Sequence, residues 1–401
     1  MGAFALEDNL RSLWNRRAES KKPVDGLRAL SVLWVIAYHT LAFIGRPLRN
    51  SDFGPLLRIV NRGHLGVDVF FVISGFLIGS LLLREHEETG TIALRSFYVR
   101  RAMRILPAYF VTLAVYVVLI GRNTDMIWAN LLFVNNFVTE GRQCMGWAWS
   151  LAVEEQFYIV FPFALLAAYK IARPLGFVVF AVGVGVVIRL AIVHHYGIHV
   201  PGPEHHHLFS NMLYNKPYGR FPQLLSGVLV GYLVHFTGAA ERLRRAPAAT
   251  TCGAVVAVAV VAALSAVEQP IFKYRWPTAV NFLYYALAQV IFSAGVAYVL
   301  FVSVTGLAGG RLLARVLSWR GFYPVSQLSY SAYLIHMIII FVGLDLGVFP
   351  SVASERGMLE PLVKIPLITL VAAIPMYMLV EKPLMNLRAN PRTRPGAAVK
   401  S

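Results

Sequence analysis

Long apolar stretches alternate with short polar connections along most of the chain. A helix needs about 20 mostly apolar residues to cross the hydrocarbon core of a bilayer. Stretches of that length begin near residues 29, 64, 105, 150, 174, 221, 251, 280, 327 and 361. The pattern therefore predicts an all-α, polytopic membrane protein with about ten transmembrane helices.

One further apolar stretch, Met126 to Val138, is shorter and contains Asn130, Asn135 and Asn136. At this length a re-entrant or interfacial segment is more typical than a membrane span. We therefore leave this stretch out of the ten helices.

Composition supports a membrane protein and excludes other classes. Hydrophobic residues make up 57% of the 401 residues and charged residues only 14%, whereas soluble domains carry roughly 25% charged residues. The net charge of +17 would fit a nucleic-acid-binding protein, but the basic residues lie in short clusters between apolar runs. Two cysteines exclude a disulfide scaffold and a cysteine-based zinc site. The first 22 residues are polar and basic, so we expect no cleaved signal peptide.

The basic residues also predict the topology. With a cytoplasmic N-terminus and ten alternating helices, 24 Lys and Arg fall in inner segments and 12 in outer segments, as the positive-inside rule requires. We therefore expect both termini in the cytoplasm and the protein in the plasma or inner membrane of the cell. The predicted parts are an N-terminal segment (1–24), a membrane domain (25–383) and a short disordered tail (384–401).

The first predicted helix carries ionisable residues where they are costly. Arg28 and His39 are 11 residues apart, so they share one helix face, with Asp25 on nearly the same face. The helical rise puts His39 about 16 Å deeper than Arg28. A buried histidine in an apolar helix is often only a packed, hydrogen-bonded residue. Ionisable groups at membrane depth nevertheless mark functional sites by default.

Two other helices carry carboxylates near the same predicted depth. Asp68 begins the second helix, where it is either a surface residue favoured by the helix dipole or a partner of His39. Glu154 in the fourth helix shares a face with Ser150 and Tyr158, and Trp149 precedes it. An interfacial belt explains the tryptophan but not the glutamate.

Basic and histidine residues provide the remaining candidates. Arg101 and Arg104 share a helix face at the inner boundary, where they either anchor the helix to anionic lipid or clamp a phosphate. His336 lies in the ninth predicted helix. A histidine-rich outer segment spans 194–207, and because its ligand spacing is irregular we favour a solvated loop over a metal site, with metal binding left open.

Taken in order, these motifs resemble the acyltransferase-3 family of integral membrane O-acyltransferases. The likeness rests on Arg28-x10-His39, Gly66-Val-Asp68-Val-Phe-Phe71, Arg101-x-x-Arg104, Trp149-Ser-Leu-x-x-Glu154-x-Gln-Phe-Tyr158, Tyr333-Leu-x-His336 and Glu381-x-Pro383. These motifs cover nearly the whole chain.

The resemblance implies a ten-helix enzyme that moves an acyl group, often acetyl, from cytosolic acyl-CoA to a hydroxyl of a sugar, glycolipid or metabolite. Many members carry a C-terminal SGNH-type domain. This sequence ends about twenty residues after the last helix, so we expect no fused SGNH domain and transfer that is direct or uses a separate partner.

Acyl transfer needs a base for the acceptor hydroxyl, and imidazole has a suitable pKa. We therefore predict His39 as the base, with Asp68 or Glu154 orienting it or binding the acceptor. Arg28, Arg101 and Arg104 are the predicted binding residues for the CoA phosphates. The residues predicted to contact substrate are Trp149, Ser150, Tyr158 and His336. No cofactor beyond acyl-CoA as the donor substrate is expected.

The identity of the acceptor, the acyl chain length, an acyl-histidine intermediate and the oligomeric state stay open. The alternative function is a transporter or flippase, because buried ionisable residues also mark translocation paths.

Overall fold

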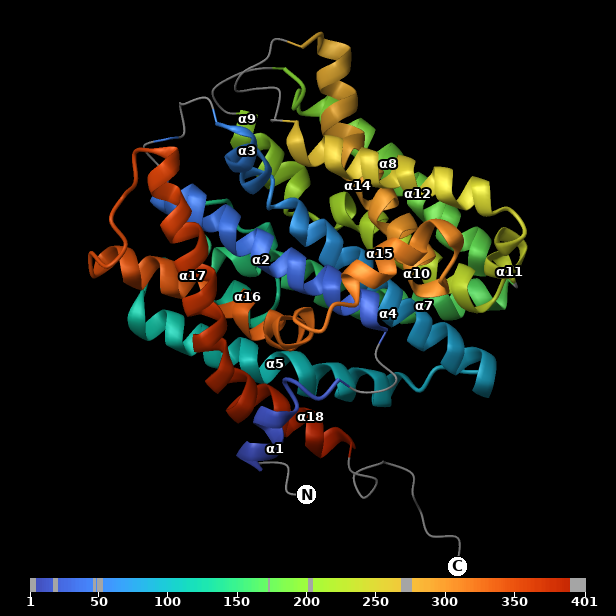
Figure 1. The fold of residues 1–401 in the computed structure, drawn as a ribbon, viewed down its shortest axis with the longest axis horizontal. Coiled ribbons are helices and arrows are strands. Elements are labelled where there is room, and N and C mark those ends of the chain that lie inside the picture. Colours follow the sequence, from blue (N-terminus) through green and yellow to red (C-terminus); the bar gives the residue numbers. More distant parts are fainter. Residues whose placement is uncertain are drawn as a thin grey trace, which may run out of the picture.

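The protein is a helical bundle in a computed structural model that describes residues 5–16, 21–45, 48, 53–171, 174–200, 205–267 and 276–389. It is 82% helical, and no β-strand occurs among the described residues. Figure 1 shows long helices packed side by side, with short helices and irregular segments at their ends. The all-α membrane fold expected from the sequence is confirmed.

Nine helical segments in the described part of the chain are long and apolar enough to cross a membrane. Their main helices are α2 (Lys22–Ile44), α4 (Leu65–Thr89), α5 (Leu94–Leu119), α7 (Trp149–Lys170), α8 (Pro174–His195), α12 (Pro247–Ala266), α14 (Thr278–Thr305), α16 (Phe322–Asp345) and α17 (Glu355–Met376). Apolar side chains of α8, α12 and α17 remain largely exposed on the bundle, where lipid would cover them.

The tenth predicted helix, α10 (Pro217–His235), is not among these nine segments, and it carries Arg220 and Gln223. It packs closely along α4 through glycines. A Cβ atom at Gly75 would lie 1.8 Å from the carbonyl oxygen of Leu224, and one at Gly227 would lie 2.0 Å from that of Val72. The close helix packing expected of small residues is therefore present between α4 and α10.

The first and last described helices lie together at one end of the bundle (Figure 1). α1 (Leu6–Arg11) contacts the π-helical segment η7 (Tyr377–Glu381) and α18 (Lys382–Ala389). Asn386 donates a hydrogen bond to the Asn9 side chain at 2.9 Å, and the hydroxyls of Ser12 and Tyr377 are 3.0 Å apart. Both ends on one side require an even number of crossings, so α10 is best counted as the tenth.

The C-terminal boundary in the sequence prediction needs one correction. Residues 384–389, assigned to a disordered tail, are helical in α18 because Asn386 bonds Asn9 and extends the packing against α1. Residues 390–401 lie outside the described part of the chain.

The segment between α5 and α7 contains no membrane-length helix, as the sequence predicted. It forms the short elements η2 (Thr124–Met126), α6 (Ile127–Leu131), η3 (Asn135–Phe137) and η4 (Gly146–Ala148). Its buried asparagines bond locally: Asn130 donates to the Tyr109 hydroxyl at 3.2 Å, and the Gln156 amide donates to Asn136 at 2.9 Å. Lys216 donates to the Asn136 carbonyl at 2.7 Å. These bonds satisfy backbone and amide groups that water cannot reach.

The remaining short elements join the long helices. They are α3 (Pro55–Asn61), α9 (His205–Phe209), η5 (Ser210–Tyr214), α11 (Ala239–Arg244), η6 (Ala308–Gly310) and α15 (Arg311–Leu317). One buried side chain, Arg189 of α8, donates to the carbonyls of Gly219, Tyr285 and Ala286 at 2.5, 3.0 and 2.7 Å. It thereby ties α8 to α10 and α14.

Candidate active site

Two cavities lie inside the bundle among the long helices. The smaller, of about 280 Å³, is lined by Arg28, Arg101 and Arg104, and we call it the arginine cavity. The larger, of about 440 Å³, is lined by His39, and we call it the histidine cavity. Val67 and Tyr333 line both. The cavities are therefore neighbours that share a wall.

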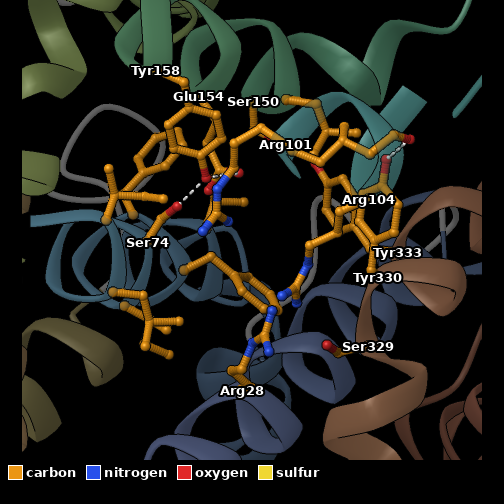
Figure 2. Close-up of a pocket in the computed structure, with 18 of the residues that line it drawn as sticks. Arg28, Ser74, Arg101, Arg104, Ser150, Glu154, Tyr158, Ser329, Tyr330 and Tyr333 are labelled. Carbon is orange, nitrogen blue, oxygen red and sulfur yellow. Dashed lines mark hydrogen bonds between the residues drawn. The ribbon is translucent and has the colours of Figure 1, made fainter. Parts of the chain in front are cut away.

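The arginine cavity combines residues from α2, α4, α5, α7 and α16. Figure 2 shows Arg28, Arg101 and Arg104 around it, with Glu154 across from Arg28. Arg101 and Arg104 come from adjacent turns of α5, as their spacing predicted, and Arg28 comes from the first turns of α2. Three guanidinium groups and one carboxylate leave this cavity with excess positive charge, which suits a phosphate-bearing ligand.

Glu154 belongs to a hydrogen-bonded chain within the arginine cavity. The Tyr158 hydroxyl donates to the Glu154 carboxylate at 3.3 Å. The only hydroxyl proton of Tyr158 is used in that bond, so Ser74 donates to Tyr158 in the contact that joins them (Figure 2). Arg101 lies over the Tyr158 ring with its guanidinium carbon 5.9 Å from the centroid. Glu154 and Tyr158 are thus both at the site, with Ser74 as an additional member.

His39 lies in the histidine cavity and contacts His336 rather than a carboxylate. The His39 Nδ1 and His336 Nε2 atoms are 3.1 Å apart, and the two rings are 4.9 Å apart between centroids. His39 Nδ1 is also 3.0 Å from the Val35 carbonyl, and His336 Nδ1 is 2.6 Å from the Tyr333 carbonyl. Two predicted site residues that are 297 positions apart therefore meet directly.

These contacts assign the proton positions on both rings. A carbonyl oxygen can only accept a hydrogen bond, so His336 donates through Nδ1 and His39 donates through Nδ1. His336 Nε2 then accepts from His39, which requires a neutral His336. In the neutral form of His39 the remaining nitrogen, Nε2, carries a lone pair, as a general base needs.

Tyr333 forms the shared wall through fixed contacts. Its hydroxyl donates to the Trp147 carbonyl at 2.8 Å, and Ser150 donates to the same hydroxyl at 2.6 Å. Its ring packs 6.3 Å from that of Phe70 and 5.6 Å from that of His336. Ser150 therefore lines the arginine cavity and also holds Tyr333 in place.

Asp68 has a different partner from the one proposed. It pairs with Arg220 of α10 at 2.8 Å, and both side chains are completely buried. Arg220 also lies over the rings of Tyr214 and Trp149, at 3.9 and 5.3 Å from their centroids. Trp149 and Tyr214 line the histidine cavity. Asp68 thus supports the wall of that cavity through Arg220, whereas His39 is oriented by Val35 and His336.

Sequence reasoning missed three residues that the structure brings to the site. Tyr333 stands in a quoted motif without a predicted role, and neither Ser74 nor Arg220 has a predicted role. Arg220 and Asp68 are 152 positions apart, so no local spacing relates them. An arginine at the start of an otherwise apolar helix was the one available signal.

The metal and cysteine predictions have the following outcome. No group of three or more His, Cys, Asp or Glu residues that could hold a metal ion occurs in the described part of the chain. His205 and His206 begin α9, and nothing is described of their side chains. Cys144 and Cys252 are free thiols, the first buried on the wall of the histidine cavity and the second exposed.

The comparison with known protein families fits this arrangement. Residues 22–381 match the family model described as "Acyltransferase domain". The chain belongs to the acyltransferase-3 family. The match takes in every helix that lines the two cavities. The resemblance seen in the sequence motifs is confirmed.

Individual relatives differ in how much of their length is matched. A protein of Staphylococcus aureus (strain COL) named "Putative O-acetyltransferase" is 37% identical over 182 residues, which are 40% of this chain and 28% of the relative. "Nose resistant to fluoxetine protein 6" of Caenorhabditis elegans is 26% identical, with 84% of this chain and 47% of the relative aligned. "Regulator of hypoxia-inducible factor 1" of the same organism is 24% identical, with 98% and 85% aligned. The chain thus spans under a third of the Staphylococcus relative. No solved structure matches.

Proposed function

We propose that this acyltransferase-3 family member is a membrane O-acyltransferase that moves an acyl group, acetyl in the simplest case, from acyl-CoA to a hydroxyl of a sugar-bearing acceptor. The observation that carries the proposal is the pair of adjoining cavities. One is rich in guanidinium groups and the other holds a histidine with a free lone pair, and they share Tyr333 as a wall. Such a pair has room for a charged donor and a neutral acceptor that meet at one point.

The donor would bind in the arginine cavity. Guanidinium groups form charge-assisted hydrogen bonds with phosphate, and Arg28, Arg101 and Arg104 all line this cavity. Further cations lie at the same end of α2. The Lys21 ammonium is 3.4 Å from His235, and burial together with Arg84 lowers the pKa of Lys21. An anion bound nearby would relieve this crowding of positive charge.

His39 would act as the general base. Its Nε2 takes the proton of the acceptor hydroxyl while the oxygen attacks the thioester carbonyl carbon and the carbon–sulfur bond breaks. CoA leaves as a thiolate, beside the arginines that favour negative charge, and the proton passes from His39 to solvent or to the thiolate. The products are an ester and CoA, so atoms and charge balance.

His336 would stabilise the protonated state of His39. When Nε2 takes a proton, His39 becomes a cation whose Nδ1–H still points at the Val35 carbonyl and His336 Nε2. Both are acceptors, and hydrogen bonds to a charged donor are the stronger kind. His336 is therefore a positioning residue rather than the substrate contact that the sequence predicted.

The acceptor would bind in the histidine cavity. Its walls are mainly aromatic, with polar side chains at intervals: Tyr38, Phe43, Tyr116, Trp147, Trp149, Phe341, Arg122, Asn123, Glu140 and Asn215. Flat rings with amide and charged groups between them suit a ring-shaped molecule that carries several hydroxyls. The name of the Staphylococcus relative, an O-acetyltransferase, supports acetyl as the transferred group.

The distribution of basic residues supports an orientation for the reaction. The N-terminal end of α2, which carries Arg28, lies toward the segments that hold most Lys and Arg. By the positive-inside rule that end faces the cytoplasm, where acyl-CoA is found. The acceptor would then enter from the outer side of the cell membrane.

A transporter or flippase is the second candidate function, and one observation favours it. Cavities stacked along a bundle also form a route through the membrane once their shared wall opens. The two candidates differ in consumption of acyl-CoA, because a transporter moves its cargo without releasing free CoA thiol.

The proposed function can be tested by mass spectrometry of surface glycans and lipids. Cells that express the wild-type chain should contain species heavier by one acyl group, and cells that express His39→Ala should lack them. His86→Ala is a matched control, because His86 stacks on Tyr169 and lines neither cavity. Acylated species that persist in the well-expressed His39→Ala strain would contradict the base assignment. Identical lipids and glycans with and without the wild-type chain would contradict the acyltransferase proposal.

A further inference from the structure

Along the bundle, the arginine cavity ends and the histidine cavity begins at one level. On each of four helices, the residues toward one end line the arginine cavity and those toward the other line the histidine cavity. The residues nearest the change on each side are Arg28 and Val35 in α2, Ile105 and Tyr116 in α5, Ser150 and Trp149 in α7, and Tyr330 and Met337 in α16. The cavities are therefore stacked end to end along the helix axes.

Tyr333 occupies this level and is held there. Its ring belongs to α16, while its hydroxyl bonds Ser150 of α7 and the Trp147 carbonyl of η4, so the side chain joins α16 to the start of α7. It is only 7% exposed, although it lines both cavities. Val67 of α4 is the other residue common to both walls, and its side chain is much smaller than the ring of Tyr333.

We propose that Tyr333 is the residue that makes the enzyme choose its acceptor over water, an inference that rests on the proposed acyltransferase function. The thioester end of the donor lies against one side of the Tyr333 ring, and the histidine cavity lies against the other. Enclosed sites protect reactive groups from hydrolysis by excluding water. With the ring in place, the histidine cavity supplies a nucleophile only when an acceptor fills that cavity and reaches the shared wall.

Loss of the ring would let water take the place of the acceptor hydroxyl. His39 would then remove a proton from water, the resulting oxygen would attack the thioester carbon, and the carbon–sulfur bond would break. The products are the free carboxylic acid and CoA, with the proton passed on to the thiolate. Water is the only co-reactant that this step needs.

The first experiment measures CoA release from acetyl-CoA by the purified full-length protein without any acceptor. Tyr333→Ala should raise the rate about tenfold over wild type, whereas Tyr333→Phe, which keeps the ring, should stay close to wild type. Tyr323→Ala is the matched control, since Tyr323 lies on the same helix, lines neither cavity and bonds the Asn15 carbonyl. An equal rise in Tyr323→Ala, or no rise in a folded Tyr333→Ala protein, would overturn the proposal.

A second experiment tests, without acyl chemistry, whether Tyr333 separates the two cavities. We call this separation the partition. In a protein with Cys144 and Cys252 changed to serine, Ala42→Cys introduces one thiol into the wall of the histidine cavity. A small charged thiol reagent should label this cysteine from only one side of sealed vesicles. Adding Tyr333→Ala should allow labelling from both sides, and adding Tyr323→Ala should not.

The two experiments separate the two proposals. Labelling from both sides in Tyr333→Ala without acetyl-CoA turnover by any variant would support the partition and contradict the acyltransferase function. Labelling from both sides in the parent protein, or from one side only in Tyr333→Ala, would contradict the partition whatever the activity.

Discussion

The arginine cavity and the histidine cavity are built in different ways. The first is lined by side chains on regular helices, mainly of α4, α5 and α7, and gathers its charge from Arg28, Arg101 and Arg104. The second takes much of its wall from irregular backbone between α5 and α7 and from the π-helical segment η5. Asn123 in that wall has a positive φ of 52°, a backbone conformation that residues other than glycine rarely adopt.

This contrast fits the proposed roles of the two cavities in donor and acceptor binding. Helices hold side chains in fixed positions, which would suit the invariant phosphates of the proposed acyl-CoA donor. Loops vary in shape more easily than helices do and are common places for binding residues. We expect donor binding to depend on the helices and acceptor choice to depend on the loop wall.

The largest effect that separates the cavities should come from Asp68→Ala. This change leaves Arg220 as a buried, unpaired charge, which costs about 3–5 kcal/mol, and Arg220 supports Trp149 and Tyr214 in the histidine cavity. Thermal unfolding in detergent should shift to lower temperature, and transfer should fall more than acetyl-CoA binding. The double variant Asp68→Leu with Arg220→Met should recover most of the stability. An unchanged unfolding temperature in Asp68→Ala would show that the pair does not support this wall.

A smaller effect is expected from His336→Ala, which removes the acceptor for His39 Nδ1. A hydrogen bond to a charged group is worth about 1.5–3 kcal/mol, so kcat should fall by roughly 10- to 100-fold, with the KM for acetyl-CoA unchanged. His336→Gln should restore part of the rate, since its side-chain oxygen can accept from His39. If His336→Gln is as slow as His336→Ala, or if KM alone rises, His336 does not position the base.

The smallest effect should come from Trp149→Phe, which keeps a ring over Arg220 but reduces the aromatic wall of the histidine cavity. Aromatic contacts contribute about 0.5–1.5 kcal/mol beyond area burial, so the KM for the acceptor should rise by about threefold and that for acetyl-CoA should stay the same. Trp319→Phe serves as a control, because Trp319 is exposed and lines neither cavity. A change in the KM for acetyl-CoA alone would contradict the assignment of Trp149 to the acceptor site.

The fold was largely predictable because its signals are local. Ten apolar stretches corresponded to ten long helices, and the asparagines of the 126–138 segment correctly indicated a break. The shared face of Arg28 and His39 also followed from helical spacing alone. Helix length, apolar character and same-face spacing are properties of neighbouring residues.

The arrangement of the site was only partly predictable because it depends on tertiary packing. Sequence spacing could not show that His336 meets His39, or that Asp68 meets Arg220, since these pairs are 297 and 152 positions apart. It also could not show that Glu154 and His39 line different cavities. A similar predicted depth for Asp68 and His39 does not by itself bring two helix faces together.

The most direct test of the two-cavity account is the binding of radiolabelled acetyl-CoA to purified variants, measured alongside the wild type. His39→Ala should bind the donor as tightly as wild type while transferring nothing. Arg101→Gln should bind it about tenfold more weakly, as expected for one lost charge-assisted hydrogen bond, and Arg100→Gln should bind normally, because Arg100 pairs with Glu85 outside the cavity. Weak donor binding by His39→Ala together with normal binding by Arg101→Gln would contradict the assignment of donor and acceptor to separate cavities.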